Sequence, residues 1–166
     1  CAMQWSGFHP TASIEGGSIT MSGLRGAPFI RVASNGTLVL EDSAFGGSTE
    51  PSVQVDGGSA TLRNVNIEGR TFPHPSGLAW PLIRVAAGTL SMERVEMLRA
   101  KELGLDIAEG ASVTVRACLF SRNAGPAISV AGELALADSE VSEGTFWEWG
   151  TSNQHHQRSP AGILVT

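Results

Sequence analysis

The sequence predicts an all-β domain built as a solenoid of short parallel strands, and three observations support this prediction. Apolar and polar residues alternate in short bursts, as in Ile83-Arg84-Val85 and Leu90-Ser91-Met92, and alternation with period two is typical of a half-buried strand. The bursts recur along the chain with a fixed internal spacing. Glycine or asparagine often separates them, as at Asn35-Gly36 and Gly57-Gly58, because a tight bend needs residues that tolerate positive φ.

The composition agrees with a single domain rich in strands and turns. The chain has 166 residues, of which 42% are hydrophobic and 16% charged, with 20 glycines. Its net charge of −5 offers no basic surface for nucleic acid. No apolar run approaches the roughly 18–20 residues that span a bilayer. We therefore expect one domain over residues 1–166, as a fragment of a larger chain, with neither a nucleic-acid partner nor a membrane span.

Three strands form each predicted coil, and the first two contribute pairs of inward apolar residues. The first-strand pairs are Ile30/Val32, Val53/Val55, Ile83/Val85, Leu105/Ile107 and Ile128/Val130. The second-strand pairs are Ile19/Met21, Leu38/Leu40, Ala60/Leu62, Leu90/Met92, Val113/Val115 and Leu134/Leu136. The third-strand positions always fall three and five residues after the last residue of the second pair, at Leu24/Gly26, Ser43/Phe45, Val65/Ile67, Val95/Met97, Cys118/Phe120 and Ser139/Val141. Because chance rarely preserves such an offset, we predict about six coils.

A variable loop follows each third strand and often ends in proline or glycine just before the next first strand, at Pro28, Pro51, Pro81, Gly104 and Pro126. Proline suits the entrance of a strand and is excluded from a central ladder. From about Ile14 to Val141, this arrangement resembles the right-handed parallel β-helix superfamily, which includes pectate lyases, phage tailspikes and many bacterial surface proteins. The resemblance implies three parallel strands per coil and one loop position at which long insertions are tolerated. A β-sandwich or antiparallel barrel also has short alternating strands, but neither requires a coil-length repeat with a fixed offset.

Stacking the coils aligns the outward residues of the first strand into a ladder: Arg31, Gln54, Arg84, Asp106 and Ser129. In enzymes of the resembled superfamily, substrate lies along one such sheet. Hydrolysis of the polygalacturonase type needs a pair of carboxylates, and lyase chemistry needs several acidic calcium ligands with a basic residue. The ladder supplies one acid, Asp106, beside Arg84. We therefore expect an exposed ion pair worth about 0.2–1 kcal/mol there, and no catalytic residue.

Two long loops, Gly69–Pro81 and Ser142–Pro160, both follow a third strand and so leave the same edge of the stack. They carry aromatic residues and histidines, among them Trp80, Trp147, Trp149 and His155. Exposed aromatic rings can stack on sugar rings, whereas the alternative is that they fold back over the stack. The candidate ligand-binding residues are Arg84, Asp106, Trp80, Trp147, Trp149 and His155. The adjacent histidines His155-His156 lack a carboxylate or cysteine at a suitable spacing, so we expect neither a metal nor a cofactor.

The two ends and the cysteines carry further expectations. The segment Ile163–Thr166 has the pattern of the opening strand of a seventh coil, so we expect a protein partner or neighbouring coils at the C-terminal edge. The segment Cys1–Pro10 is expected to fold over the first coil as a cap. Cys118 is predicted to be a free, inert core thiol. Cys1 is either the acylated residue of a lipoprotein or a fragment boundary, and the sequence leaves both open.

The function predicted from these features is a non-catalytic structural or interaction module, a rigid rod of a surface, secreted or assembled protein. It would bind glycan or protein through its aromatic loops, at the cell surface or outside the cell. The alternative is a polysaccharide lyase or glycoside hydrolase whose missing catalytic residues lie outside this chain. The sequence favours the non-catalytic role without excluding the enzyme.

Overall fold

The computed structural model describes residues 2–6, 9–46, 50–69, 80–100, 103–123, 125–142 and 162–166. These residues form a 15-stranded sheet without helices, in which every pairing except β1 with β2 is parallel. The predicted all-β class with parallel strands is therefore confirmed. The strands are β1 (Ala2–Ser6), β2 (His9–Ile14), β3 (Gly17–Ser22), β4 (Arg25–Gly26), β5 (Phe29–Ala33), β6 (Gly36–Gly46), β7 (Val53–Glu68), β8 (Ile83–Leu98), β9 (Leu105–Ile107), β10 (Ala111–Arg116), β11 (Leu119–Ser121), β12 (Ile128–Val130), β13 (Glu133–Ala137), β14 (Glu140–Val141) and β15 (Ile163–Val165).

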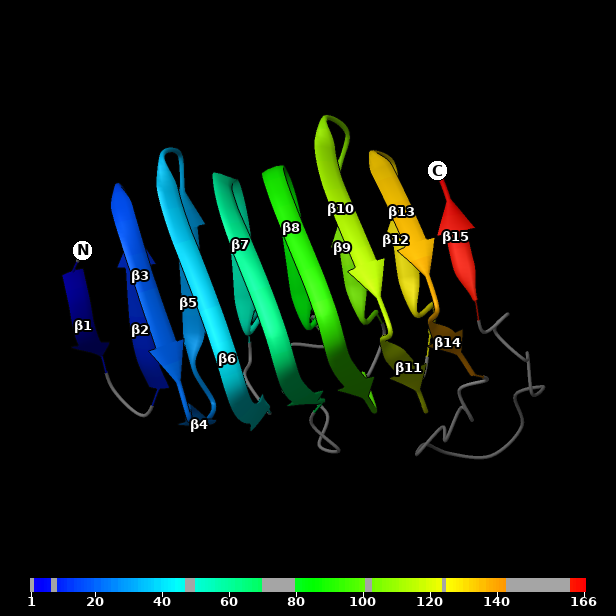
Figure 1. Cartoon of the computed structure of the whole chain (residues 1–166), viewed down its shortest axis with the longest axis horizontal. Helices are drawn as coiled ribbons and strands as arrows, with labels where there is room; N and C mark the ends of the chain where they lie inside the picture. Colours follow the sequence, from blue (N-terminus) through cyan, green and yellow to red (C-terminus); the bar gives the residue numbers. More distant parts are fainter. Residues whose placement is uncertain are drawn as a thin grey trace, which may run out of the picture.

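The strand pairings form three rows. The first row runs β1-β2-β5-β7-β8-β9-β12-β15, the second β3-β6-β7-β8-β10-β13, and the third β4-β6-β7-β8-β11-β14. The long strands β7 and β8 belong to all three rows, because the chain bends within them at single residues of positive φ, such as Asn64 and Arg94, and strand pairing continues on both sides of each bend. We call one passage through the three rows a unit, so that β2 to β4 form the first unit and β12 to β14 the sixth. Figure 1 shows the units following one another along the long axis, with one row of strands in front of another.

The register between units agrees with the pattern expected from the sequence. In the first row Val53 pairs with Ile83, in the second Ala60 with Leu90, and in the third Val65 with Val95. The inward residues of the middle units are almost fully buried, and those of all three rows form one continuous hydrophobic cluster. Burial decreases toward both ends of this cluster, where several inward residues are only partly buried: Ile19, Met21, Leu24, Leu134 and Val141.

A single residue with positive φ forms the corner between the second and third rows. These corner residues are Gly23, Asp42, Asn64, Arg94, Ala117 and Asp138, with φ between 47° and 68°. One left-handed residue between two extended segments turns the chain and resets the in–out alternation. This explains the constant offset of three residues in the sequence. Asn and Asp adopt this conformation more readily than other non-glycine residues, which accounts for three of the six corners.

Small polar side chains complete the backbone hydrogen bonding next to the corners. Ser43 Oγ accepts a hydrogen bond from the Leu24 N–H at 3.0 Å and donates one to the Glu41 carbonyl at 2.7 Å. Cys118 and Ser139 make the same pair of contacts in later units. Cys118 is buried and free, and burial raises the pKa of its thiol above the ordinary value of 9.0. The prediction of a buried, free core thiol at this position is confirmed.

The two ends of the first row differ. β15 pairs with β12 in parallel and in register, with Ile128 opposite Ile163, as expected for the first strand of a seventh coil. β1 instead pairs antiparallel with β2. The N-terminal segment therefore adds a strand to the edge of the first row, where a cover over the first coil was expected. Gly7, Phe8 and Cys1 lie outside the described residues.

Candidate functional site

The expected ladder of polar residues lies on the outer face of the first row. Arg31 is opposite Gln54, Gln54 is opposite Arg84, and Arg84 is opposite Asp106. Arg84 Nε lies 3.7 Å from Asp106 Oδ2, and both side chains are partly exposed, 39% and 29%. The structure thus brings the predicted pair together across neighbouring strands.

Asp56 joins this ladder as a second carboxylate that the sequence reasoning missed. Arg31 Nε lies 2.6 Å from Asp56 Oδ2. Gln54 Nε2 donates to both carboxylate oxygens, at 2.9 and 3.0 Å. Burial on its own raises the pKa of Asp56, but the hydrogen bonds from Gln54 and Arg31 and the positive charges of Arg31 and Arg84 outweigh it. The pKa therefore lies below its ordinary value of 3.8.

Local backbone geometry places Asp56 on this face. Asp56 stands two residues after Gln54 in β7, so both side chains point outward. The register between β7 and β8 shifts on either side of Asp56, and Gly57 follows with φ of 112°. The same position is alanine in four of the other five units, at Ala33, Ala86, Ala108 and Ala131, and Glu15 in the first unit. An aspartate at a position that is otherwise mostly alanine is the signal that would have identified it. We call Arg31, Gln54, Asp56, Arg84 and Asp106 the first-row strip.

Trp80 is the one predicted aromatic residue that the structure describes. It precedes β8, the strand that carries Arg84, by three residues and is 43% exposed. Arg84 Nε is itself shielded from solvent and, among the described residues, has no hydrogen-bond partner. This N–H therefore faces Asp106 Oδ2 at 3.7 Å, at a point that solvent does not reach.

The other predicted loop residues, Trp147, Trp149 and His155, lie outside the described residues, as do His74 and His156. Within the described part of the chain, no group of three or more His, Cys, Asp or Glu residues is arranged to hold a metal ion. The same part contains no helix long and apolar enough to cross a membrane.

A second polar region lies at the corner between the second and third rows, and the sequence reasoning did not anticipate it. The corner residues and the outward residues of the third row line an open groove of about 1050 Å³ that extends across all six units, from Arg25 to Glu140. We call it the corner groove. It depends on the left-handed corners, so only a column of polar residues at the corner position, Asp42, Asn64, Arg94 and Asp138, could have indicated it.

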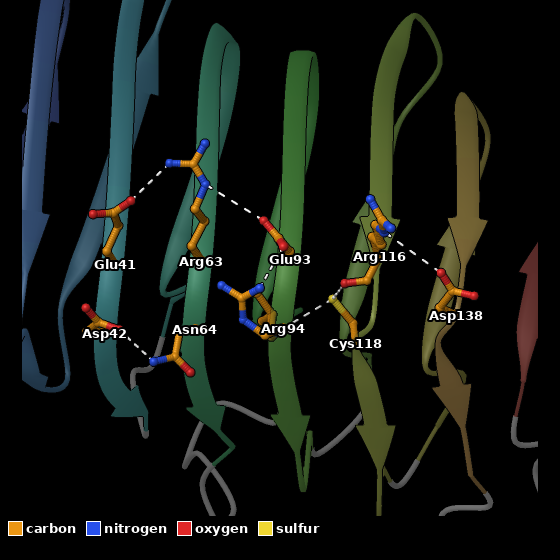
Figure 2. A network of polar contacts seen from close by, with 10 residues as sticks. Glu41, Asp42, Arg63, Asn64, Glu93, Arg94, Arg116, Cys118 and Asp138 are labelled. Atoms are coloured by element: carbon orange, nitrogen blue, oxygen red, sulfur yellow. Dashed lines mark hydrogen bonds and ion pairs between the residues drawn. The ribbon is translucent and has the colours of Figure 1, made fainter.

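A row of ion pairs borders the corner groove on the second-row side. Arg63 lies between Glu41 and Glu93, at 3.0 and 4.0 Å, and Arg116 Nε lies 3.8 Å from Asp138. Figure 2 shows these side chains forming a band across β6, β7, β8 and β10 to Asp138 at the end of β13, with the corner residues Asp42, Asn64 and Arg94 below it. Their side chains are largely exposed, so each pair contributes little to stability. Opposite charges alternate along the band from Glu41 to Asp138.

No family model, curated protein or solved structure matches the chain.

Proposed function

We propose that the chain is a right-handed parallel β-helix of about six coils, of the kind found in the pectate-lyase-like superfamily that it resembles. Three rows of parallel strands, one shared core and one left-handed corner per unit support this interpretation. The right hand follows from the strong preference of parallel crossover connections for that hand.

We further propose that this β-helix is a rigid, non-catalytic interaction module of an extracellular or surface protein, and that it binds carbohydrate along the first-row strip. The observation that carries the proposal is the cross-strand row of charges from Arg31 through Asp56 and Arg84 to Asp106, with the exposed Trp80 three residues before β8. Planar carboxylate, amide and guanidinium groups bind sugar hydroxyls, while an aromatic ring stacks on the apolar face of a sugar. Two arginines and two aspartates leave the strip without net charge, which favours a neutral polysaccharide.

A glycan array tests this proposal with three variants. Trp80→Ala removes the stacking platform, and the double variant Arg84→Gln/Asp106→Asn removes charge from the strip while keeping side-chain volume. Glu109→Gln, at an exposed turn outside the strip, is the matched control. We expect the chain and the control to bind the same neutral glycans, and the other two variants to lose that binding while keeping the circular dichroism spectrum of the parent. Equal binding by all four proteins would refute the assignment to the strip.

Asp56 also bears on the alternative function, that of a glycoside hydrolase or polysaccharide lyase. With Asp106 it gives the strip two carboxylates, the minimum for glycoside hydrolysis. A general acid, however, needs a raised pKa to stay protonated near neutrality, and the pKa of Asp56 is lowered. We expect no release of reducing ends or unsaturated products from neutral or acidic polysaccharides. Release that disappears in Asp56→Asn would establish the enzyme instead.

We propose a protein partner or neighbouring coils at the C-terminal edge. Four large apolar side chains of the sixth unit and β15 are exposed by 39–77%: Leu136, Ile163, Leu164 and Val165. An exposed strand edge with apolar side chains is a template for another strand. A strand pairing there would slow hydrogen exchange of the Ile163 to Val165 amides, and unchanged exchange on adding the partner would refute the contact.

A further inference from the structure

The outer face of the second row carries one column of alternating charges. Four successive strands, β6, β7, β8 and β10, contribute residues that the register sets opposite one another: Glu41, Arg63, Glu93 and Arg116 (Figure 2). We call these four residues the charged column. In the first and sixth units the same position is neutral, at Ser22 and Ala137. The charges read minus, plus, minus, plus along the stack, so reversing the order of the units exchanges every sign.

The rest of this face is built from small side chains. Two columns run beside the charged column, two and four residues earlier in each strand: Thr20, Val39, Thr61, Ser91, Thr114 and Ala135, and Ser18, Thr37, Ser59, Thr89, Ser112 and Glu133. Only Glu133, at the end of its column, is long. Figure 1 shows these strands side by side in the front row. Because small side chains keep a sheet face even, a second sheet face can pack against it.

The charged side chains remain accessible despite their contacts within the chain. Arg63 lies 3.0 Å from Glu41 and 4.0 Å from Glu93, yet it is 49% exposed and the two glutamates 36% and 42%. Arg116 is 70% exposed, and its contact with Asp138 is loose, at 3.8 Å. These contacts run along the face between neighbouring strands. The side turned away from the sheet is therefore open to charges of another molecule.

A second copy of the chain has the complementary pattern when it is turned about a two-fold axis parallel to the strands, between β7 and β8. This rotation sets each column of one copy against the same column of the other and reverses the order of the units. The second unit then faces the fifth, and the third faces the fourth. Glu41 of each copy meets Arg116 of the other. Arg63 likewise meets Glu93, so the symmetry gives four ion pairs between the copies.

The neighbouring charges are compatible with this arrangement. At the corner position the rotation sets each charged residue against a neutral one: Asp42 against Ala117, Arg94 against Asn64, and Asp138 against Gly23. A two-fold axis parallel to the stack would instead set each residue of the charged column against itself, and like charges repel. The charges therefore select the axis parallel to the strands.

We infer that two copies of the chain associate through the outer faces of their second rows, about a two-fold axis parallel to the strands. Six strands of about six residues form a face of ~29 Å by ~20 Å, so the pair buries about 1,200 Å² in total. This area lies at the low end of specific interfaces, so the dimer is weak and depends on its charges. The first-row strip belongs to another row and stays free in both copies.

Sedimentation equilibrium of the whole chain tests the inference. We expect a reversible dimer whose dissociation constant rises with added salt, since its contacts are exposed charges. Glu41→Arg and Arg116→Glu each turn two of the four ion pairs between the copies into repulsions. Each exposed pair contributes about two- to fivefold in affinity, so each variant should raise the dissociation constant about tenfold or more.

The double variant Glu41→Arg/Arg116→Glu separates contacts between copies from contacts within one chain. The two changed residues meet across the axis with opposite charges, so the dimer should recover. Within one chain they are three units apart, ~14–15 Å, and cannot compensate for each other. The matched control is Glu109→Arg/Arg116→Glu, which has the same net charge but changes an exposed turn outside the face. It should dissociate as readily as Arg116→Glu alone.

Three results would overturn the inference. The parent could remain monomeric at every concentration and salt. The two single variants could dimerise as tightly as the parent, which would place the contact elsewhere, such as the C-terminal edge. The control could recover as fully as the double variant, which would indicate an effect of net charge. Trp80→Ala, which tests carbohydrate binding, should leave the dimer unchanged, so the two proposals can fail independently.

Discussion

The same side chain at equivalent positions of two units offers a direct test of the packing. Leu62 and Leu136 both occupy the second inward position of the second row, but Leu62 is fully buried and Leu136 is 39% exposed. Truncating a buried leucine to alanine costs about 2–5 kcal/mol, because apolar contact is lost and a cavity is left. We therefore expect Leu62→Ala to lower the free energy of unfolding by ~3 kcal/mol. Leu136→Ala loses only part of the transfer free energy and leaves no closed cavity, so we expect ~1 kcal/mol.

Urea unfolding followed by circular dichroism measures both values. The urea concentration at the unfolding midpoint of Leu62→Ala should be well below that of Leu136→Ala. The two variants should show a similar dependence of the unfolding free energy on urea concentration if unfolding remains cooperative. Equal losses in the two variants would show that Leu62 is not enclosed by neighbouring units, and would contradict the shared core. If the unfolding free energy of one variant alone depended only weakly on urea concentration, the units of that variant would no longer unfold together.

Three further predictions address the corners and the strip. Ala117→Gly should raise the free energy of unfolding by ~0.5–1 kcal/mol, because Ala117 holds φ of 52° and glycine adopts this region without the steric cost; a loss of stability in thermal unfolding would contradict the corner. Ser43→Ala should cost about 1–3 kcal/mol by the same measurement, because the part-buried Leu24 N–H loses its partner and the Glu41 carbonyl keeps only the Gly23 N–H, and no change would mean that water replaces the hydroxyl. The lowered pKa of Asp56 stabilises the fold above about pH 4, where the carboxyl is charged in both states, and this contribution is lost as the pH falls through the folded-state pKa. Asp56→Asn should therefore be less stable than the parent at neutral pH and approach it in acid, whereas a difference that does not depend on pH would refute the ion pairing.

The sequence predicted the strands and their register well because both depend on short-range alternation. Inward residues such as Ile83 and Val85 must alternate with outward ones, and a slip of one residue would expose all of them. The constant step of three residues that leads from the second strand to Val95 and Cys118 reflects the geometry of the corner. Its cause, one left-handed residue, is evident only from the backbone.

The site was predicted less completely, for two physical reasons. Asp56 was not predicted as a member of the strip, because it stands directly before the Gly57-Gly58 turn, and its contact with Arg31 depends on a register shift at that point. The corner groove requires side chains separated by more than a hundred residues, from Arg25 to Glu140, to line one surface. That proximity follows from stacking and not from any local motif. Arg84 and Asp106 were paired correctly because their positions follow directly from the register.

Disulfide cross-linking between neighbouring units tests the parallel, in-register stacking most directly. Thr61 lies opposite Ser91 in the second row, while Glu93 is two residues further along the same strand. In a chain with Cys1→Ser, the pair Thr61→Cys/Ser91→Cys should form an intramolecular disulfide under mild oxidation, because directly opposite residues fall within the 4.4–6.8 Å Cα separation that a disulfide needs. The pair Thr61→Cys/Glu93→Cys should not form one, since that separation is ~8 Å. Cross-linking of the second pair in preference to the first would contradict the register on which the core, the first-row strip and the corner groove all depend.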